Sequence, residues 1–343
     1  MSVADTMRAA VFAGAGRLSI ENVPIPSLSH DDDVLLRVRA VGICGSDVHI
    51  LSVPPRHPAT IGVILGHEYV ADVEAVGQAV THVAAGDRVV VDPTPPCGIC
   101  AYCQMDQPNM CENNLSMGVF THGGMAAYSR VPARAVFRIS PDVPDDQAVL
   151  AEPIADVLNG IRRASPRLGE IVLVLGAGPI GLLFTLLLRA AGVGRILVSE
   201  VAPLRARRAV ECGADVVINP AVEDLAAAVQ REAPRGADLV IDAVGKLLGD
   251  ALRTVRKGGR LLLFGVDDSA QIPVRQSELT IKELSILGSY IDRLTFPQAI
   301  RLLEGRRIDF SKLVTHRLPL ARVAEGVDLL RRGEGVKVVV SPE

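Results

Sequence analysis

Residues 171–181 read IVLVLGAGPIG, an apolar run that leads into three closely spaced glycines. Residues 171–175 are apolar and partly β-branched, which is typical of a buried strand in a parallel sheet. Residues 180–191 favour a helix. The stretch therefore predicts a strand, a tight turn and a buried helix in direct succession.

The turn carries the pattern Gly176-x-Gly178-x-x-Gly181. Gly176 permits a tight turn, Gly178 lets the backbone approach a pyrophosphate, and Gly181 allows close packing of helix and strand. The helix, which Pro179 and Ile180 open, would present free N–H groups and a partial positive charge to the phosphates. In this context the pattern predicts a dinucleotide-binding turn, and three glycines that serve packing alone are the alternative.

An acidic residue, Glu200, follows the next apolar run, 195–199. At the end of that strand a carboxylate can accept hydrogen bonds from the hydroxyls of an adenosine ribose. It would also repel a ribose 2′-phosphate, which favours NAD over NADP. Arg205 complicates this interpretation because a nearby guanidinium can accept such a phosphate. We therefore expect NAD, with NADP as the less favoured alternative.

Between residues 151 and 290, short apolar runs alternate with helical stretches. This alternation implies a doubly wound α/β domain in which helices cover both faces of a parallel sheet. The expected strands are residues 171–175, 195–199, 216–218, 239–241 and 261–264, and the expected helices are residues 180–191, 204–212, 223–232 and 247–256.

Residues 1–150 and 291–343 form the second predicted domain, which is rich in strands. Residues 34–41 (VLLRVRAV) alternate apolar and charged side chains, as a half-buried strand does. Glycine and proline break the apolar runs at short intervals. The other expected elements are strands at 69–76, 88–91 and 336–340 and helices at 296–304 and 321–331.

Length and charge narrow the class of protein. The chain has 343 residues, enough for two cores, and a formal net charge of −3. It lacks the concentrated basic field of a nucleic-acid or membrane-surface binder. The start of the chain does not read as a secretory signal, and glycines interrupt the uncharged run 171–188. We expect a cytoplasmic protein with no nucleic-acid or membrane partner.

Four of the six cysteines lie within residues 97–111. In a large chain without a secretory signal, this density indicates metal rather than disulfides. Four thiolates close a tetrahedral zinc shell and leave no position for a substrate, so this metal should be structural. An iron–sulfur cluster is the chemical alternative, and the absence of CxxCH excludes haem attachment. The predicted lobe spans about residues 92–115, with the ligands Cys97, Cys100, Cys103 and Cys111.

Four separated segments resemble the zinc-containing medium-chain dehydrogenase/reductase family, in its polyol (sorbitol) and threonine dehydrogenase branch. The resemblance covers essentially the whole chain and implies a GroES-like catalytic domain beside a Rossmann domain. The segments are VGICGSDVH at 41–49, Gly66-His67-Glu68, Ala151-Glu152-Pro153 and the glycine turn. Further matches are Gly86-Asp87-Arg88-Val89, Lys257-Gly258-Gly259 and Lys337-Val338-Val339-Val340.

The resemblance implies a second, catalytic zinc in each subunit. Cys44, His67 and Glu152 match the positions around that zinc. Glu68 matches an acid that either ligates the metal or sits just behind it in relatives. A thiolate, an imidazole and a carboxylate make a plausible zinc shell that keeps one position for water or substrate. Whether Glu68 or Glu152 is the direct third ligand stays open.

Two further residues match the proton path of the family. In relatives, a hydroxyl at the position of Ser46 contacts the alcohol oxygen, and a histidine at the position of His49 passes the proton outward. Histidine suits this role because its ordinary pKa lies near neutrality. The resemblance thus implies oxidation of a secondary alcohol to a ketone, or the reverse, by hydride transfer to or from the nicotinamide.

The resemblance implies a substrate that is a polyol, a cyclitol or an amino alcohol. Sorbitol-like recognition is in doubt, because Ile50 and the pair Ile291–Asp292 replace an aromatic residue and an Arg-Tyr pair of the polyol branch. Threonine-type amino-alcohol oxidation is therefore the alternative within the family. A non-catalytic NAD sensor is the alternative outside it. The residues expected to shape the pocket are Ile50, His57, Phe120, His122 and Tyr290.

Relatives of this length associate as tetramers through strands of the Rossmann sheet. Residues 284–287 (LSIL) are the candidate edge, although a buried internal strand would have the same composition. We expect a homo-oligomer, with a tetramer favoured over a dimer.

Overall fold

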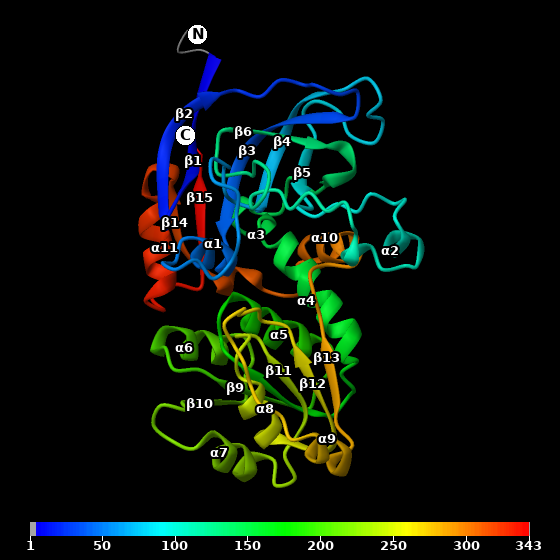
Figure 1. Cartoon of the computed structure of the whole chain (residues 1–343), viewed down its shortest axis with the longest axis vertical. Helices are drawn as coiled ribbons and strands as arrows, with labels where there is room; N and C mark the ends of the chain where they lie inside the picture. The colour runs from blue at the N-terminus through cyan, green and yellow to red at the C-terminus, as the bar shows by residue number, and fades with distance from the viewer. Residues whose placement is uncertain (1–4, 343) are drawn as a thin grey trace. The chain divides into compact units, whose positions relative to one another are not determined.

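The computed structural model describes residues 5–342 and divides into two compact units. Unit 1 comprises Met1–Ala155 and Asp292–Glu343, and unit 2 comprises Asp156–Ile291 (Figure 1). The first boundary falls inside one helix, α4 (Ala151–Ala164). Each unit has its own hydrophobic core.

Unit 2 is built on a six-stranded sheet, and all residues of this sheet are described by the structure. All of its neighbouring strands are parallel. The spatial order is β10-β9-β8-β11-β12-β13. The strands are β8 (Ile171–Leu175), β9 (Arg195–Ser199), β10 (Val216–Ile218), β11 (Ala237–Asp242), β12 (Val255–Leu263) and β13 (Ser285–Gly288).

Numbered along the chain, these strands have the order 3-2-1-4-5-6 of a doubly wound Rossmann sheet, which confirms the predicted fold class. The sheet lies between α5 and α6 on one side and α7, α8 and α9 on the other (Figure 1). The helices are α5 (Pro179–Ala190), α6 (Pro203–Glu211), α7 (Leu225–Glu232), α8 (Leu248–Thr254) and α9 (Gln276–Lys282).

Two predicted boundaries in unit 2 are wrong. The helix expected at 247–256 ends at Thr254, and the strand expected at 261–264 already begins at Val255, which pairs with Ala237. Val255 is β-branched and buried, which favours the strand, and Arg256 is held by an ion pair with Asp238 at 2.6 Å. These tertiary contacts override the helical pattern of the preceding residues.

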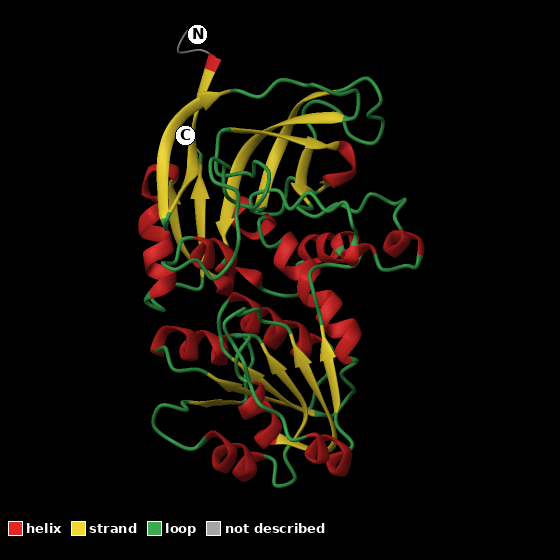
Figure 2. Cartoon of the chain, in the orientation of Figure 1, coloured by secondary structure: helices red, strands yellow, loops and turns green. Residues whose placement is uncertain are grey.

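Unit 1 contains a hairpin and a larger, mainly antiparallel sheet, and Figure 2 shows how much of it consists of strands and long loops. The large sheet has the order β14-β15-β3-β4-β5-β7, and β6 pairs with β3. The strands are β1 (Thr6–Gly14), β2 (Arg17–Pro24), β3 (Asp33–Ile43), β4 (Glu68–Val76), β5 (Arg88–Val91), β6 (Tyr128–Pro132), β7 (Val136–Arg138), β14 (Val314–Pro319) and β15 (Lys337–Ser341).

Short helices join these strands. The α-helices are α1 (Gly45–Ile50), α2 (Ala101–Gln104), α3 (Asp145–Ala148), α10 (Phe296–Gly305) and α11 (Val323–Arg331). The 3-10 helices are η2 (Pro108–Met110), η3 (Ala133–Ala135), η4 (Phe310–Leu313) and η5 (Leu320–Arg322).

Strand β3 occupies the centre of unit 1. It pairs antiparallel with β4, which sets Gly42 opposite Glu68, and antiparallel with β15, which sets Gly42 opposite Val339. Because β3 ends at Ile43, Cys44 follows directly and begins the turn into α1. The register of three strands therefore fixes the surroundings of Cys44.

The apolar run 171–188 does not form a single long helix. It forms β8, the glycine turn and most of α5. Within residues 5–342, every helix is too short or too polar to cross a bilayer.

Two buried carboxylates of unit 1 influence one another. Asp92 follows β5 and is 4% exposed, and Asp292 is 7% exposed. Burial, with the charge of Asp292 as a second cause, raises the pKa of Asp92 to about 8. The Asp92 carboxylate accepts hydrogen bonds from Thr94 N at 2.8 Å and Thr94 Oγ1 at 3.3 Å, which do not offset these effects.

We predict that Asp92→Asn removes part of the pH dependence of stability. The folded-state pKa of Asp92 lies above its unfolded value of 3.8, so its contribution to stability is present below pH 4 and is lost as the pH rises towards 8. Relative to the variant, the parent should lose about 1 kcal/mol or more between pH 5 and 8. Thermal unfolding across this range measures the difference. The exposed Asp142→Asn is the control, and equal pH profiles for parent and Asp92→Asn would contradict the prediction.

Candidate functional site

The chain after β3 places three predicted residues on, or directly before, one short helix. Cys44 immediately precedes α1, and its backbone N–H donates to Asp47 Oδ2 at 2.9 Å. Ser46 and His49 lie three positions apart on α1, so their side chains share a face. Ser46 and His49 are both half-buried, which leaves them accessible to a small molecule.

His67 is held between two residues of this helix. Ser46 Oγ lies 3.2 Å from His67 Nε2, and Asp47 Oδ1 lies 3.8 Å from His67 Nδ1. Burial lowers the pKa of His67, but the charges of Asp47, Glu152 and Glu68 outweigh it and raise that pKa above its ordinary value. The Nε2 edge therefore faces the serine, while the Nδ1 edge faces a wholly buried carboxylate.

Asp47 is a functional residue that the sequence reasoning missed. Its side chain is fully buried, and burial raises its pKa while the charge of His67 opposes that effect. At 3.8 Å from His67 Nδ1, Asp47 Oδ1 is beyond hydrogen-bond distance, and neither of these two buried atoms has a hydrogen-bond partner, so the interaction is one of charge. The sequence shows an acid three residues after Cys44, in the segment GSDVH, but no local pattern links this acid to His67.

Glu68 is completely buried and paired with a residue from the far end of the chain. Lys337 Nζ donates to Glu68 Oε1 at 2.7 Å and also to Oε2. Burial lowers the pKa of Lys337, but the charges of Glu68 and Cys44 outweigh it and raise that pKa. The residues around Lys337 predict a strand, and no pattern in the sequence predicts this ion pair.

The structure brings three of the four predicted ligands together. Ligand atoms of Cys44, His67 and Glu68 all lie within 4.8 Å of one another. Glu152, at the start of α4, acts electrostatically on His67 and Lys337 but does not belong to this set. One thiol, one imidazole and one carboxylate are a donor set that suits zinc.

The electrostatics of this set also fit a cation. Burial, with the charge of Glu68, raises the pKa of the Cys44 thiol to about 12. Protein groups alone therefore do not stabilise a thiolate here, whereas a divalent cation deprotonates a coordinating thiol. Three carboxylates also act on one imidazole. The set is an anionic, buried site, and a bound metal would balance its charge.

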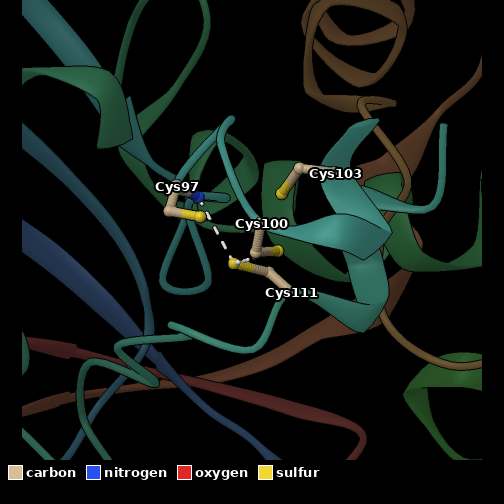
Figure 3. Close-up of side chains that lie close together, drawn as sticks. All are labelled: Cys97, Cys100, Cys103 and Cys111. Carbon is tan, nitrogen blue, oxygen red and sulfur yellow. Dashed lines mark hydrogen bonds between the residues drawn. The ribbon is translucent and has the colours of Figure 1, made fainter. Parts of the chain in front are cut away.

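The cysteine lobe forms a second donor set. The four sulfur atoms of Cys97, Cys100, Cys103 and Cys111 lie within 4.8 Å of one another and face a common centre (Figure 3). The sulfurs of Cys100 and Cys111 are 3.9 Å apart, close to the edge of about 3.8 Å in a tetrahedron with 2.3 Å zinc–sulfur bonds. The geometry therefore suits a closed four-thiolate shell.

Hydrogen-bond donors surround these sulfurs. Asn113 Nδ2 donates to Cys97 Sγ at 3.4 Å, and the backbone N–H groups of Cys97 and Asn113 donate to Cys111 Sγ at 3.3 and 3.4 Å. The Asn113 amide, with backbone N–H groups as further causes, lowers the pKa of Cys97 to about 6. A thiolate is thus favoured at Cys97 near neutral pH, as metal ligation requires.

The glycine turn of unit 2 has the geometry that its sequence predicted. Gly176 has a φ of +92°, in the region that favours glycine, and a Cβ on Gly181 would overlap the Gly176 carbonyl oxygen. A Cβ on Gly178 would meet nothing within 4 Å. Two of the glycines are therefore required by the fold, whereas Gly178 leaves open space. Pro179 and Ile180 form the first turn of α5 behind it.

Glu200 braces this turn from the end of β9. Its Oε2 accepts from Ala177 N at 2.7 Å, and its Oε1 accepts from Val201 N at 2.8 Å and Ala202 N at 2.7 Å. Burial lowers the pKa of the nearby Arg205, although the charge of Glu200 opposes this effect. The predicted ribose acceptor thus lies at the turn and also shapes it.

The residues expected to shape a substrate pocket differ in their surroundings. Ile50 is fully buried in the core of unit 1, so its side chain packs inside the unit. His122 accepts a hydrogen bond from Ile64 N at 3.1 Å, and Phe120 is 46% exposed. His57 is half-buried, and its Nδ1 contacts Pro58 O at 2.8 Å. Tyr290 belongs to unit 2 and is 50% exposed.

Comparison with known families agrees with this architecture. Residues 30–141 match the model of the alcohol dehydrogenase GroES-like domain, and residues 179–305 match that of zinc-binding dehydrogenase.

Individual relatives resemble the chain over nearly its whole length. D-arabinitol dehydrogenase 1 of Uromyces fabae is 33% identical, with 94% of each chain covered. L-threonine 3-dehydrogenase of Anaeromyxobacter dehalogenans is also 33% identical, with 93% of each chain covered. A crystal structure of an alcohol dehydrogenase from E. coli CFT073, complexed with NADH, has a TM-score of 0.90 and 32% identity, and covers 98% of this chain and 99% of its own.

Two family models match the chain, and its relatives are similar to it over nearly their whole length. The strand order of unit 2 and the two donor sets of unit 1 agree with these matches. The chain belongs to the zinc-containing medium-chain dehydrogenase/reductase family, in its polyol dehydrogenase branch, and is an NAD(P)-dependent dehydrogenase.

Proposed function

We propose that the protein interconverts a secondary alcohol and its ketone, with a catalytic zinc held by Cys44, His67 and an acidic residue. The observation that carries this proposal is the convergence of Cys44, His67 and Glu68 within 4.8 Å, beside Ser46. When bound, zinc supplies Lewis-acid chemistry that makes an alcohol more acidic, and NAD accepts the hydride.

The residues of the chain then have separate tasks. Ser46 Oγ lies 3.2 Å from His67 Nε2, so its hydroxyl could accept a proton from an alcohol bound there while it gives up its own proton. His49, one turn further along α1, could accept that released proton and pass it outward. The charge of Asp47 acts on the opposite edge of the His67 ring. Glu152 contributes negative charge at His67, and we infer that Glu68 is the closer candidate for a third ligand.

We further propose a structural zinc in the cysteine lobe and NAD as the cofactor. The closed set of four sulfurs leaves no position for a substrate. The buried carboxylate of Glu200 at the glycine turn favours a ribose with a free 2′-hydroxyl over a 2′-phosphate.

The substrate class that we propose is a polyol, a cyclitol or an amino alcohol. The relatives that resemble this chain equally well include a D-arabinitol dehydrogenase and an L-threonine 3-dehydrogenase. The residues Ile50 and Ile291–Asp292 lack the aromatic and cationic groups of the polyol branch, which argues against sorbitol-like recognition, and threonine-type oxidation is kept as the alternative. A panel of these alcohols, followed by NADH absorbance, separates the classes.

We also propose a cytoplasmic homotetramer. Thiolate metal sites need reduced cysteines, which a reducing compartment maintains. Strand β13 is the terminal strand of its sheet, and a second copy could pair with its outer side. Sedimentation velocity at micromolar concentration distinguishes a tetramer from a monomer.

We predict that His67→Ala abolishes turnover but leaves the cofactor site intact. Loss of the imidazole removes a metal ligand, so kcat/KM should fall by about a thousandfold or more. Metal analysis should show two zinc ions in the parent chain and one in the variant, because the cysteine lobe keeps its own. NADH affinity, measured by fluorescence, should be unchanged. The exposed His82→Ala is the control, and an active His67→Ala protein would overturn the mechanism.

Two glycine variants should separate folding from cofactor binding. Gly181→Ala should destabilise unit 2 by several kcal/mol, because the new methyl group overlaps the Gly176 carbonyl. Gly178→Ala should fold as the parent does, because its Cβ meets open space, yet bind NADH about tenfold or more weakly, since the methyl occupies the approach to the pyrophosphate. Unfolding curves and NADH titration of both variants measure this. Normal NADH affinity in Gly178→Ala would place the dinucleotide elsewhere.

Glu200 should set the choice of cofactor. Glu200→Gln removes the charge that repels a 2′-phosphate, so the ratio of kcat/KM for NAD to that for NADP should fall about tenfold. The amide NH2 of Gln cannot accept the backbone N–H bonds on one side of Glu200, so an unfolding curve of the variant accompanies the kinetics. The matched control is Glu211→Gln, an acid at the end of α6 that pairs with Arg208. A parent enzyme that prefers NADP would show that this interpretation of Glu200 is wrong.

A further inference from the structure

Two loops of unit 1 contain no acidic residue, although both lie next to residues of the proposed catalytic site. Residues 48–67 run from α1 to the start of β4, and residues 113–127 follow the cysteine lobe. Neither segment holds an Asp or a Glu, in a chain that has 39 acidic residues. The ionisable side chains of the two loops are Arg56, His57 and His122, together with a metal ligand at the end of the first loop.

The first loop is fixed to the end of α1. His49 O accepts hydrogen bonds from Ser52 N at 3.2 Å, Ser52 Oγ at 2.7 Å and Arg56 N at 3.0 Å. Ser52 Oγ also accepts from Arg56 N at 3.1 Å. The backbone of Arg56 therefore lies against the residue that we propose as the outer member of the proton path. The turn that ends the catalytic helix also sets the position of Arg56.

The guanidinium of Arg56 is available to a ligand. Arg56 is exposed, and within residues 5–342 its side chain has no carboxylate partner. A guanidinium stays charged and can bind two oxygens of a carboxylate or phosphate with parallel N–H donors. On a loop without acids, its positive charge is not cancelled by a neighbour in the sequence. Arg56 is therefore a group that attracts an oxyanion to this border of the site.

The second loop packs against the chain just before the metal site. Gly124 N donates to Gly66 O at 2.7 Å, and a Cβ on Gly123 would lie 2.1 Å from the same oxygen. The two loops are also joined to each other, because Thr60 N donates to Val119 O at 3.0 Å. They therefore form one continuous border beside the proposed catalytic residues.

His122, on the second loop, presents a hydrogen-bond donor in a fixed tautomer. Its Nδ1 lies 3.1 Å from Ile64 N, and a backbone N–H can only donate, so Nδ1 is the acceptor. The proton of the neutral ring is then on Nε2. His122 is exposed, so a small molecule at the loop surface can reach its ring. We call Arg56 and His122 together the oxyanion rim.

We propose that the substrate is a polyol that carries an oxyanion, either a carboxylate or a phosphate monoester, which Arg56 and His122 bind while the reacting alcohol lies beside Ser46. The rim offers a charged fork and a neutral N–H, which both donate to oxygen. It offers no free acceptor for an ammonium group, because Nδ1 of His122 is already occupied. This inference rests on the proposed function and narrows its substrate class, with anionic polyols ranked above neutral polyols and amino alcohols.

Matched substrates test this assignment. Sorbitol, gluconate and sorbitol 6-phosphate share one carbon chain and differ in the charge at one end, and the corresponding galactitol and arabinitol series cover other configurations. In the parent protein, kcat/KM with NAD should be about tenfold or more higher for the anionic members, mainly through a lower KM. NADH absorbance measures turnover, and calorimetric titration of the NADH-bound protein measures affinity without turnover. The carboxylate and phosphate members show which oxyanion the rim accepts.

Variants of the rim assign the preference to its residues. Arg56→Gln should lower the ratio of anionic to neutral kcat/KM about tenfold, and Arg56→Lys should restore part of it, because the charge returns. His122→Asn keeps an acceptor for Ile64 N but removes the Nε2–H donor, so it should lower the same ratio by a smaller factor. The matched control is Arg134→Gln, an exposed arginine of η3 without a carboxylate partner in the described part of the chain. Its ratio should equal that of the parent.

The outcomes separate this inference from the proposed function. A parent protein that oxidises neutral polyols or threonine as well as the anionic polyols overturns the oxyanion rim and leaves the proposed dehydrogenase intact. A preference for anionic substrates that survives both Arg56→Gln and His122→Asn also overturns it, because another group would then bind the oxyanion. A parent protein that oxidises no alcohol of the panel with NAD or NADP contradicts the proposed function itself.

Discussion

The register of β3 against β4 and β15 is the constraint on which the metal site depends. It sets Gly42 opposite both Glu68 and Val339, and it ends the strand just before Cys44. A shift by one residue would turn Glu68 to the other face of the sheet. The apolar side chains of β3, buried throughout the centre of unit 1, make such a slip costly because it would expose them. The core of unit 1 therefore specifies the position of the ligands.

This constraint also explains why so much negative charge lies near one imidazole. Asp47, Glu68 and Glu152 all act on His67, and each has a different connection to the fold. Asp47 belongs to α1, Glu68 begins β4, and Glu152 belongs to α4. Lys337, whose charge also acts on His67, pairs with Glu68. The remaining charge is the reason that a divalent cation suits the site.

The sequence predicted the parts of the molecule whose signals are local. The glycine turn, the strands of unit 2 and the four cysteines each occupy one short segment, and their physical requirements can be read from that segment. The roles of Asp47 and Lys337 could not be predicted in this way, because each depends on a partner from another strand or helix. The boundary at Val255 was missed for the same reason, since a tertiary strand pairing overrides the local helical pattern.

The two thiol sites of unit 1 differ in what stabilises the thiolate. In the cysteine lobe, the Asn113 amide and backbone N–H groups lower the pKa of Cys97 to about 6, so the loop itself prepares a ligand for a cation. At Cys44, burial and the charge of Glu68 raise the pKa to about 12, so the protein alone opposes the thiolate. At Cys97 a metal would complete a charge that the loop already favours, whereas burial raises the pKa of Cys103, in the same lobe, to about 12. A metal at Cys44 must overcome the opposing charge of Glu68, and the bonds of Glu68 to Lys337 reduce that opposition. The charge of Lys337 itself also lowers the pKa of Cys44, so the cation that pairs with Glu68 makes the thiolate ligand easier to form.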